Sequence, residues 1–187
     1  MSSHHIVKED QEPALIIAAT DRIPSSLLNQ LLEWNPIVIT DGRNLEHVVQ
    51  LGIKVDVLVT DEPADLSQDH VFVLPLTTSF LDTALTYLIK RGCRAANILS
   101  TDVDPNLLLR YAAKIQVVLL SNGRRTFVVK SGFTKWKPKG ESVFLHSNQV
   151  IETKGLQQTG ENEYITAHDG FYSIHFDQSH GLVGEQI

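Results

Sequence analysis

Aspartate residues follow several short apolar runs of this sequence, at positions where a fold could gather them for chemistry. The residues in question are Asp21, Asp41, Asp61 and Asp102. Clustered carboxylates repel one another unless a cation joins them, and such oxygen ligands suit Mg²⁺ together with substrate phosphates. The pattern therefore predicts a magnesium–nucleotide site, with the alternative that these are ordinary loop and cap residues. Asn44, three residues after Asp41, is a good candidate for a helix N-cap.

The elements that must position these residues are strand-length apolar runs that alternate with helical patterns. The runs lie at residues 14–19, 36–40, 55–59, 71–74, 96–99 and 115–120. Alternation of strands and helices is typical of βαβ units and a parallel sheet, where ligands bind beyond the carboxyl ends of the strands. We expect a mostly parallel, Rossmann-like α/β domain over residues 1–120. Neither GxxxxGK[ST] nor GxGxxG follows the first run, so neither a P-loop nor a dinucleotide site is supported.

The hydrophobic pattern of the sequence changes after the turn dipeptide Asn122-Gly123. Short alternating segments follow at residues 126–130, 134–137, 142–146, 150–153, 163–166 and 171–176, separated by turn-forming residues. This spacing is typical of antiparallel strands in a sandwich. We therefore expect a second, small domain over residues 121–187 that is an antiparallel β-sandwich.

The composition of the chain argues against several classes of protein. The chain has 187 residues, a net charge of −6 and a single cysteine, which argues against a nucleic-acid binder and excludes a disulfide framework. The first twelve residues lack an apolar run that would suit a signal peptide or a membrane span. We expect a cytoplasmic protein with no membrane partner.

The most prominent cluster of basic residues lies at the start of the second domain. Its members are Arg124, Arg125, Lys130, Lys135, Lys137 and Lys139. They alternate with apolar and aromatic residues, which indicates the solvated face of half-buried strands. The alternative is that some of them contact a phosphate or another anion.

Two segments of the first domain carry a family resemblance. Residues 40–45 read TDGRNL and residues 51–61 read LGIKVDVLVTD. Together they resemble the thiamin pyrophosphokinase family, whose pattern is D-G-x-x-N, a helix, and then G-x-x-P-D-x-x-x-G-D-x-D-S. The match carries over Asp41, Gly42, Asn44, Asp56 and Asp61, and residues 127–132 resemble the start of the family's sandwich.

The resemblance implies a function and roles for particular residues. Members of the family are dimers with an α/β nucleotide-binding domain and a β-sandwich, and they transfer a pyrophosphoryl group from ATP to thiamin with Mg²⁺. By that resemblance Asp41, Gly42 and Asn44 bind the nucleotide, Asp41 and Asp61 hold the metal, and Asp61 is catalytic. Trp136 is the candidate contact for the thiamin ring, and the chain is expected to form a homodimer.

The sequence departs from the family pattern at several functional positions. Pro63 and Ala64 replace an acid and a serine, and Phe80 stands where the family has the aspartate of a helix start. Residues 100–105 read STDVDP, without the arginine and histidine expected there. We expect a divergent member with degenerate catalytic motifs and little turnover, unless Asp65 or Asp82 takes over a missing role.

The sequence is compatible with three functions. The chain is a divergent thiamin pyrophosphokinase, a non-catalytic binding or assembly module on the same scaffold, or an enzyme that acts on another phosphorylated metabolite. The departures favour the second.

Overall fold

The structure of the chain is a computed structural model, and it describes residues 12–19, 24–63, 66, 68–145 and 150–187. The chain divides into two compact units. The first contains the described residues through Thr101 together with Lys114–Gln116, and the second contains Asp102–Ala113 and Val117–Ile187.

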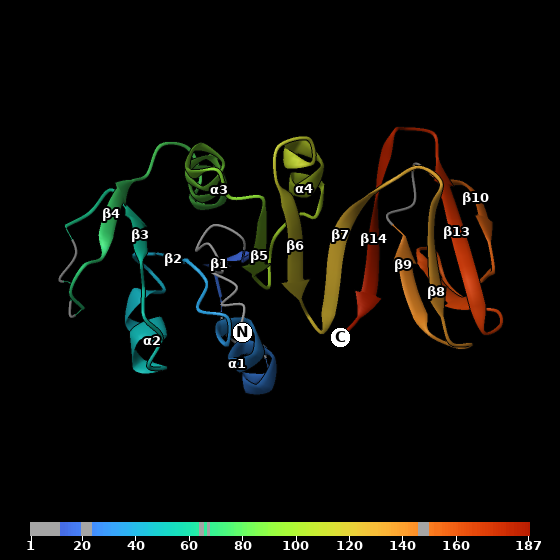
Figure 1. Cartoon of the computed structure of the whole chain (residues 1–187), viewed down its shortest axis with the longest axis horizontal. Coiled ribbons are helices and arrows are strands. Elements are labelled where there is room, and N and C mark those ends of the chain that lie inside the picture. Colours follow the sequence, from blue (N-terminus) through green and yellow to red (C-terminus); the bar gives the residue numbers. More distant parts are fainter. Residues whose placement is uncertain (1–11, 20–23, 64–65, 67, 146–149) are drawn as a thin grey trace, which may run out of the picture. The chain divides into compact units, whose positions relative to one another are not determined.

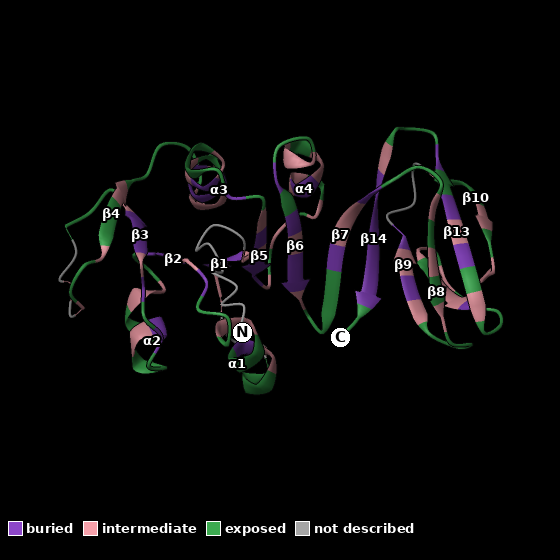
Figure 2. Cartoon of the chain, viewed as in Figure 1, coloured by how far each residue is buried: buried purple, intermediate pink, exposed green. Residues whose placement is uncertain are grey.

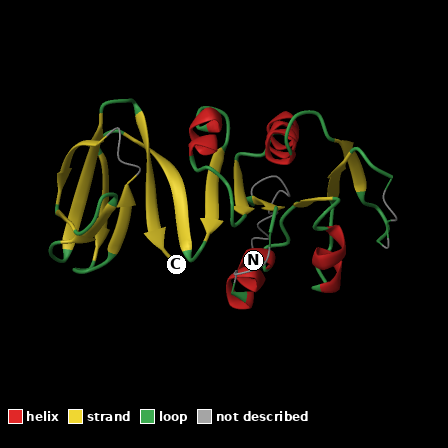
Figure 3. Cartoon of the chain, turned by 180° about the vertical axis from the view of Figure 1, so that it is seen from behind, coloured by secondary structure: helices red, strands yellow, loops and turns green. Residues whose placement is uncertain are grey.

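The first unit is a parallel sheet with helices on both faces (Figure 1). Its strands are β1 (Ala14–Ile17), β2 (Val38–Asp41), β3 (Val57–Thr60), β4 (Phe72–Pro75) and β5 (Ala95–Leu99). Their order is β5-β1-β2-β3-β4, and every pair of neighbours is parallel. Its helices are α1 (Ser25–Leu32), α2 (Leu45–Gln50) and α3 (Phe80–Arg91), and α3 lies across the sheet from α1 and α2 (Figure 3). The predicted parallel α/β arrangement is confirmed.

Local sequence explains where these elements begin and end. All four residues of β1 are buried, as a strand covered on both faces requires (Figure 2). Helix α3 begins after Ser79, whose side chain accepts a hydrogen bond from the Asp82 amide, and ends at Gly92 with φ of 87°. These signals define where α3 begins and ends and explain the burial of β1.

The second unit is antiparallel, as expected. It contains helix α4 and nearly all of β6, followed by eight further described strands. These elements are α4 (Asn106–Tyr111), β6 (Gln116–Ser121), β7 (Arg124–Lys130), β8 (Phe133–Lys137), β9 (Ser142–Leu145), β10 (Val150–Lys154), β11 (Leu156–Gln158), β12 (Glu163–Thr166), β13 (Gly170–Phe176) and β14 (His180–Gln186). Within this unit, the strands of the larger sheet have the order β11-β12-β9-β14-β7-β6, and those of the smaller sheet have the order β10-β13-β8. Residue 146, expected in a strand, lies outside the described residues.

Side chains from both sheets build one core in the second unit. Val129, Val143, Leu145 and Val183 come from the larger sheet, and Tyr172, Ile174 and Phe176 come from β13 of the smaller one. The two sheets therefore pack face to face as a sandwich.

Strand β6 belongs to the same sheet as β1, β2, β3 and β5, as expected, and it also pairs with β7 in antiparallel fashion, so that this sheet is mixed. The two compact units divide the chain near residue 102, because helix α4 packs on β7 and β14 of the second unit. A change of domain at residues 120–121 stays a prediction.

Strand β14 was not predicted, although it lies between β7 and β9 and is buried from Gly181 to Glu185. Two glycines and a glutamate make its sequence a poor strand pattern. The close packing of β14 favours both glycines, because a Cβ atom at Gly181 would lie 2.3 Å from the Phe176 ring and one at Gly184 would lie 3.0 Å from Phe144 Cβ.

None of the helices in the described ranges is long and apolar enough to cross a membrane.

Candidate ligand-binding site

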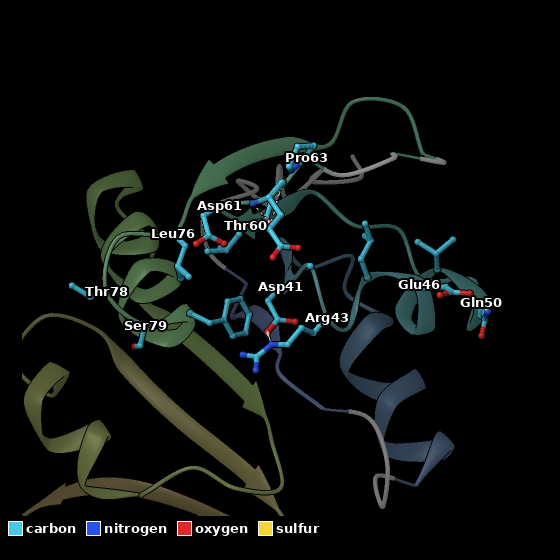
Figure 4. A pocket seen from close by; sticks show the side chains of 16 residues that line it. Asp41, Arg43, Glu46, Gln50, Thr60, Asp61, Pro63, Leu76, Thr78 and Ser79 are labelled. Carbon is cyan, nitrogen blue, oxygen red and sulfur yellow. Dashed lines mark hydrogen bonds and ion pairs between the residues drawn. The ribbon is translucent and has the colours of Figure 1, made fainter.

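A cavity of about 910 Å³ opens in the first unit where β2 and β3 end. Its wall includes Asp41 and Gly42 after β2, Asp61 after β3, and Phe80 at the start of α3. Figure 4 shows Asp41 and Arg43 on one side of this space and Thr60 and Asp61 on another. The structure thus brings together three of the residues that the sequence pointed to, at the predicted edge of the sheet.

Asp41 is 7% exposed, and its carboxylate already has partners. Its Oδ1 atom accepts hydrogen bonds from the backbone N–H of Asn44 at 3.0 Å and from Asn44 Nδ2 at 2.7 Å. Its Oδ2 atom lies 3.4 Å from Nε of the exposed Arg43. A metal ion or a phosphate group near Asp41 must therefore compete with contacts that build the turn.

Asn44 precedes α2 as predicted, but its side chain does not cap that helix. Instead Nδ2 also donates to the Ala18 carbonyl at 2.9 Å, which ties the start of α2 to the end of β1. Its contacts are thus structural, and Asn44 does not itself line the cavity.

Gly42 allows the turn after β2 to approach β3 closely. A Cβ atom at this position would lie 3.2 Å from Thr60 Oγ1. That hydroxyl accepts a hydrogen bond from the Glu62 amide at 3.0 Å, which shapes the loop after β3. A side chain at position 42 would push this loop away from the Asp41 turn.

The loop after β3 supplies two exposed carboxylates of the cavity, and Glu46 of α2 is a third. Asp61, Glu62 and Pro63 are exposed and line the cavity. Among the described residues, no hydrogen bond or ion pair engages the carboxylate of Asp61. Asp56, which the resemblance also carried over, accepts a hydrogen bond from the Val38 amide at 2.9 Å and is structural.

The start of α3 presents an aromatic ring where the family pattern has an acid. Phe80 lines the cavity, and Asp82 is engaged in a reciprocal capping arrangement with Ser79. Asp82 is not among the residues that line the cavity. Asp65, the other proposed substitute, and Asp21 and Ala64 lie outside the described residues.

The oxygen donors at this edge fit Mg²⁺ only in part. Within the described ranges, no group of three or more His, Cys, Asp or Glu residues is placed to hold a metal ion. Asp102 is exposed and does not line the cavity. The free carboxylate of Asp61 suits a hydrated Mg²⁺ ion that phosphates also hold. At Asp41, the ion could bind only if the Arg43 side chain moved away from the carboxylate.

Solved structures with the same arrangement identify the fold. No family model matches the sequence, and no curated protein sequence matches it. The thiamin pyrophosphokinase of Bacillus subtilis is similar over 93% of this chain and 98% of its own, with a TM-score of 0.65 and 14% identity. The chain has the thiamin pyrophosphokinase fold.

Two further solved structures have the same fold. The thiamin pyrophosphokinase of Candida albicans has a TM-score of 0.65 at 12% identity, over 94% of this chain and 89% of its own. The yeast thiamin pyrophosphokinase has a TM-score of 0.63 at 10% identity, over 98% and 88%. The predicted resemblance is confirmed at the level of the fold.

Trp136, the proposed thiamin contact in this pyrophosphokinase fold, lies on β8 of the second unit. Its side chain is 53% exposed, and it pairs across strands with Phe171 of β13, which is 67% exposed. The two residues alternate with inward-facing neighbours such as Tyr172, so they form an aromatic surface on the outer face of the small sheet.

Sequence reasoning missed a charged cluster inside the second unit. Glu185 of β14 is fully buried, and Arg125, Lys135 and Lys137 surround its carboxylate. Burial alone would raise the pKa of Glu185, but hydrogen bonds from Lys135 and Arg125 outweigh it and hold that pKa below its usual value. Burial, with the nearby Glu185 charge, raises the pKa of Tyr172, so this phenol stays neutral and donates to Glu185.

The contacts of Lys135 and Lys137 therefore correct part of the sequence-based interpretation. These residues were interpreted as the solvated face of a strand, but both reach the buried carboxylate of Glu185. The signal that could have found this cluster is the lone glutamate in an otherwise apolar and glycine-rich stretch.

Proposed function

We propose that this chain is a thiamin pyrophosphokinase-like protein that keeps a ligand cavity and has lost most or all pyrophosphoryl transfer. The observation that supports this is the set of side chains at the cavity. Asp41 is engaged by Asn44 and Arg43, and Asp61 is the accessible carboxylate that the family pattern shares. Pro63 and Phe80 occupy positions where the pattern calls for acids.

The chemistry of phosphoryl transfer explains why these changes matter. The protein contributes mainly positioning and the stabilisation of charge by metal ions and cationic groups. Proline can neither bind a metal nor donate a hydrogen bond, and the apolar ring of Phe80 offers no oxygen ligand. Among the described residues, the cavity has one arginine, Arg43, against four carboxylates, those of Asp41, Glu46, Asp61 and Glu62. Phosphate alone would be repelled, so a nucleotide would enter together with Mg²⁺.

The proposed ligands follow from these contacts. Asp41, Gly42 and Asn44 would position the nucleotide, with Asn44 acting through the shape of the turn. Mg²⁺ would be held by Asp61, and by Asp41 if Arg43 moves aside, and it would neutralise the phosphates. Trp136 would stack against the thiamin ring.

Calorimetry with the full chain tests binding separately from catalysis. We expect Mg-ATP to bind, and we expect Asp61→Asn to weaken binding about tenfold or more because the accessible metal ligand is lost. Asp177→Asn is the matched control, since Asp177 is an exposed carboxylate of the second unit. Thiamin should bind to the unmodified chain and lose affinity in Trp136→Ala.

Other calorimetric results would favour one of the two alternative functions. Nucleotide binding without thiamin binding would favour an enzyme that acts on a different phosphorylated metabolite. An absence of heat with ATP, ADP, AMP and thiamin would contradict a ligand-binding role and favour an assembly module.

A homodimer is the proposed assembly state. The second unit is small, and a core of that size is marginal by itself. The exposed Phe171 ring offers apolar area that a second copy would cover. Light scattering at micromolar concentration should give about twice the 20.9 kDa mass of the chain. A monomer mass at that concentration would contradict the proposal.

A further inference from the structure

The Glu185 cluster consists of Glu185, Arg125, Lys135 and Lys137, and the proposed function does not use it. Oε2 of Glu185 accepts from Arg125 Nε at 2.9 Å, from Arg125 Nη2 at 2.6 Å and from Lys135 Nζ at 2.8 Å. Oε1 accepts from Lys135 Nζ at 2.7 Å and lies 3.7 Å from Lys137 Nζ. Three cations thus converge on one carboxylate that is 0% exposed.

The charges of this cluster do not cancel. Lys137 has a second acidic partner, Glu141, at 3.5 Å. Tyr172 is the remaining contact of Glu185, and its phenol is neutral. Arg125 and Lys135 therefore share the single charge of Glu185, which leaves one positive charge in excess. This excess is local, because the whole chain carries a net charge of −6.

The cations with the excess charge are accessible and retain free donors. The side chain of Arg125 is 46% exposed and that of Lys135 is 34% exposed, although Glu185 beneath them is fully buried. A guanidinium has five N–H donors, and Arg125 directs Nε and Nη2 at Glu185. Within the ranges that the structure describes, Nη1 of Arg125 has no partner.

We propose that the Glu185 cluster binds a phosphate-type oxyanion through Arg125 and Lys135. Glu185 is the inner support: it holds both cations in fixed positions, so little side-chain freedom is lost when an anion arrives. The planar guanidinium suits an oxyanion with two parallel hydrogen bonds, and the ammonium of Lys135 adds a point charge. All four residues belong to the second unit, so this site does not depend on the cavity beside Asp61.

Thermal unfolding of the full chain tests this proposal. Inorganic phosphate is added at constant ionic strength, with sodium chloride as the reference salt. We expect the Tm to rise with the logarithm of the phosphate concentration above the Kd, by about 3–5 °C at roughly ten times the Kd. In Arg125→Gln and Lys135→Gln the rise should fall below about 1 °C, whereas Lys130→Gln, an exposed cation of the same strand β7, should respond as the unmodified chain does.

Two further arms identify the anion and the place where it binds. Phenyl phosphate at equal concentration distinguishes a site for free anions from one for phosphate esters, which would prefer the ester. Asp61→Asn should leave the phosphate response unchanged, so that failure of the cavity proposal and failure of this one are distinguishable. Since Arg125→Gln can also weaken the fold, amide NMR shifts of the unmodified chain during a phosphate titration provide a second measurement.

The outcomes are decisive in both directions. Amide shifts confined to β7, β8 and the end of β14, together with loss of the Tm response in both cluster variants, would support the site. Equal responses in all variants, shifts spread over the chain, or no response beyond that of chloride would overturn it.

Discussion

Replacing Glu185 by glutamine should lower the free energy of unfolding by about 3 kcal/mol. The substitution keeps the size of the side chain but removes the charge that Arg125, Lys135 and Lys137 share. Removing one partner of a buried ion pair commonly costs about 3–5 kcal/mol because the remaining charge is left uncompensated. We expect the lower end of that range, since Arg125 and Lys135 are partly exposed and water can reach them.

Urea unfolding measures this difference, and Glu163→Gln is its matched control. Glu163 pairs with Arg124 at 3.2 Å in the same unit, but both side chains are about half exposed. An exposed pair contributes about 0.2–1 kcal/mol, so the control should lie close to the unmodified chain. Equal urea midpoints for the two variants would contradict the prediction, because they would show that the buried charge of Glu185 contributes no more to stability than an exposed one.

The pH dependence of stability provides an independent check on Glu185. Because its pKa is lower in the folded chain than in the unfolded one, its contribution is fully present above the unfolded pKa of about 4.3. The contribution is lost as the pH falls through the folded pKa. Glu185→Gln should therefore lose less stability than the unmodified chain when the pH is lowered from neutrality through this range.

Formation of thiamin diphosphate from Mg-ATP and thiamin should be at least about a thousandfold slower than in an intact pyrophosphokinase. Loss of one group that stabilises charge typically costs about 10²–10³ in kcat, and this chain lacks several. Pro63 and Phe80 supply no ligand at the cavity, and residues 100–105 contain no arginine or histidine. We expect a decrease in rate close to that for the loss of a single charge-stabilising group, because the effects of several such losses are not additive.

A side-by-side assay with the Bacillus subtilis thiamin pyrophosphokinase checks this prediction. Product is quantified by chromatography, with the Asp177→Ala variant as a control for substitution itself. Robust turnover that disappears in Asp61→Ala would contradict the degenerate-site interpretation. It would mean that other residues, such as Asp65 or Asp82, supply the missing roles, and Asp82 would then have to leave its capping contact with Ser79.

The sequence alone determined the order and type of most elements in this chain. Continuous apolar runs such as Ala14–Ile17 predicted buried parallel strands, and Gly92 correctly marked the end of α3. The parallel arrangement then placed Asp41 and Asp61 at one edge, where they do share a cavity. Such features are readable because strand periodicity and helix-stop signals act over a few neighbouring residues.

Only the tertiary structure decided what the individual polar side chains contact. The sequence did not show that Asn44 bonds to Ala18 and Asp41, or that Asp82 caps a helix with Ser79. These partners depend on local angles and on chain segments up to 26 residues apart. A carboxylate that looks free for metal binding can therefore be engaged already.

Strand β14 is an element of the fold that the sequence alone did not predict. Its glycines lower strand propensity, and its burial arises because β7 and β9 flank it and Phe176 lies against Gly181. Glu185 is tolerated there because Arg125 and Lys135, 60 and 50 residues away in sequence, meet it inside the sandwich. Long-range contacts, rather than local propensity, make this strand and its charge possible.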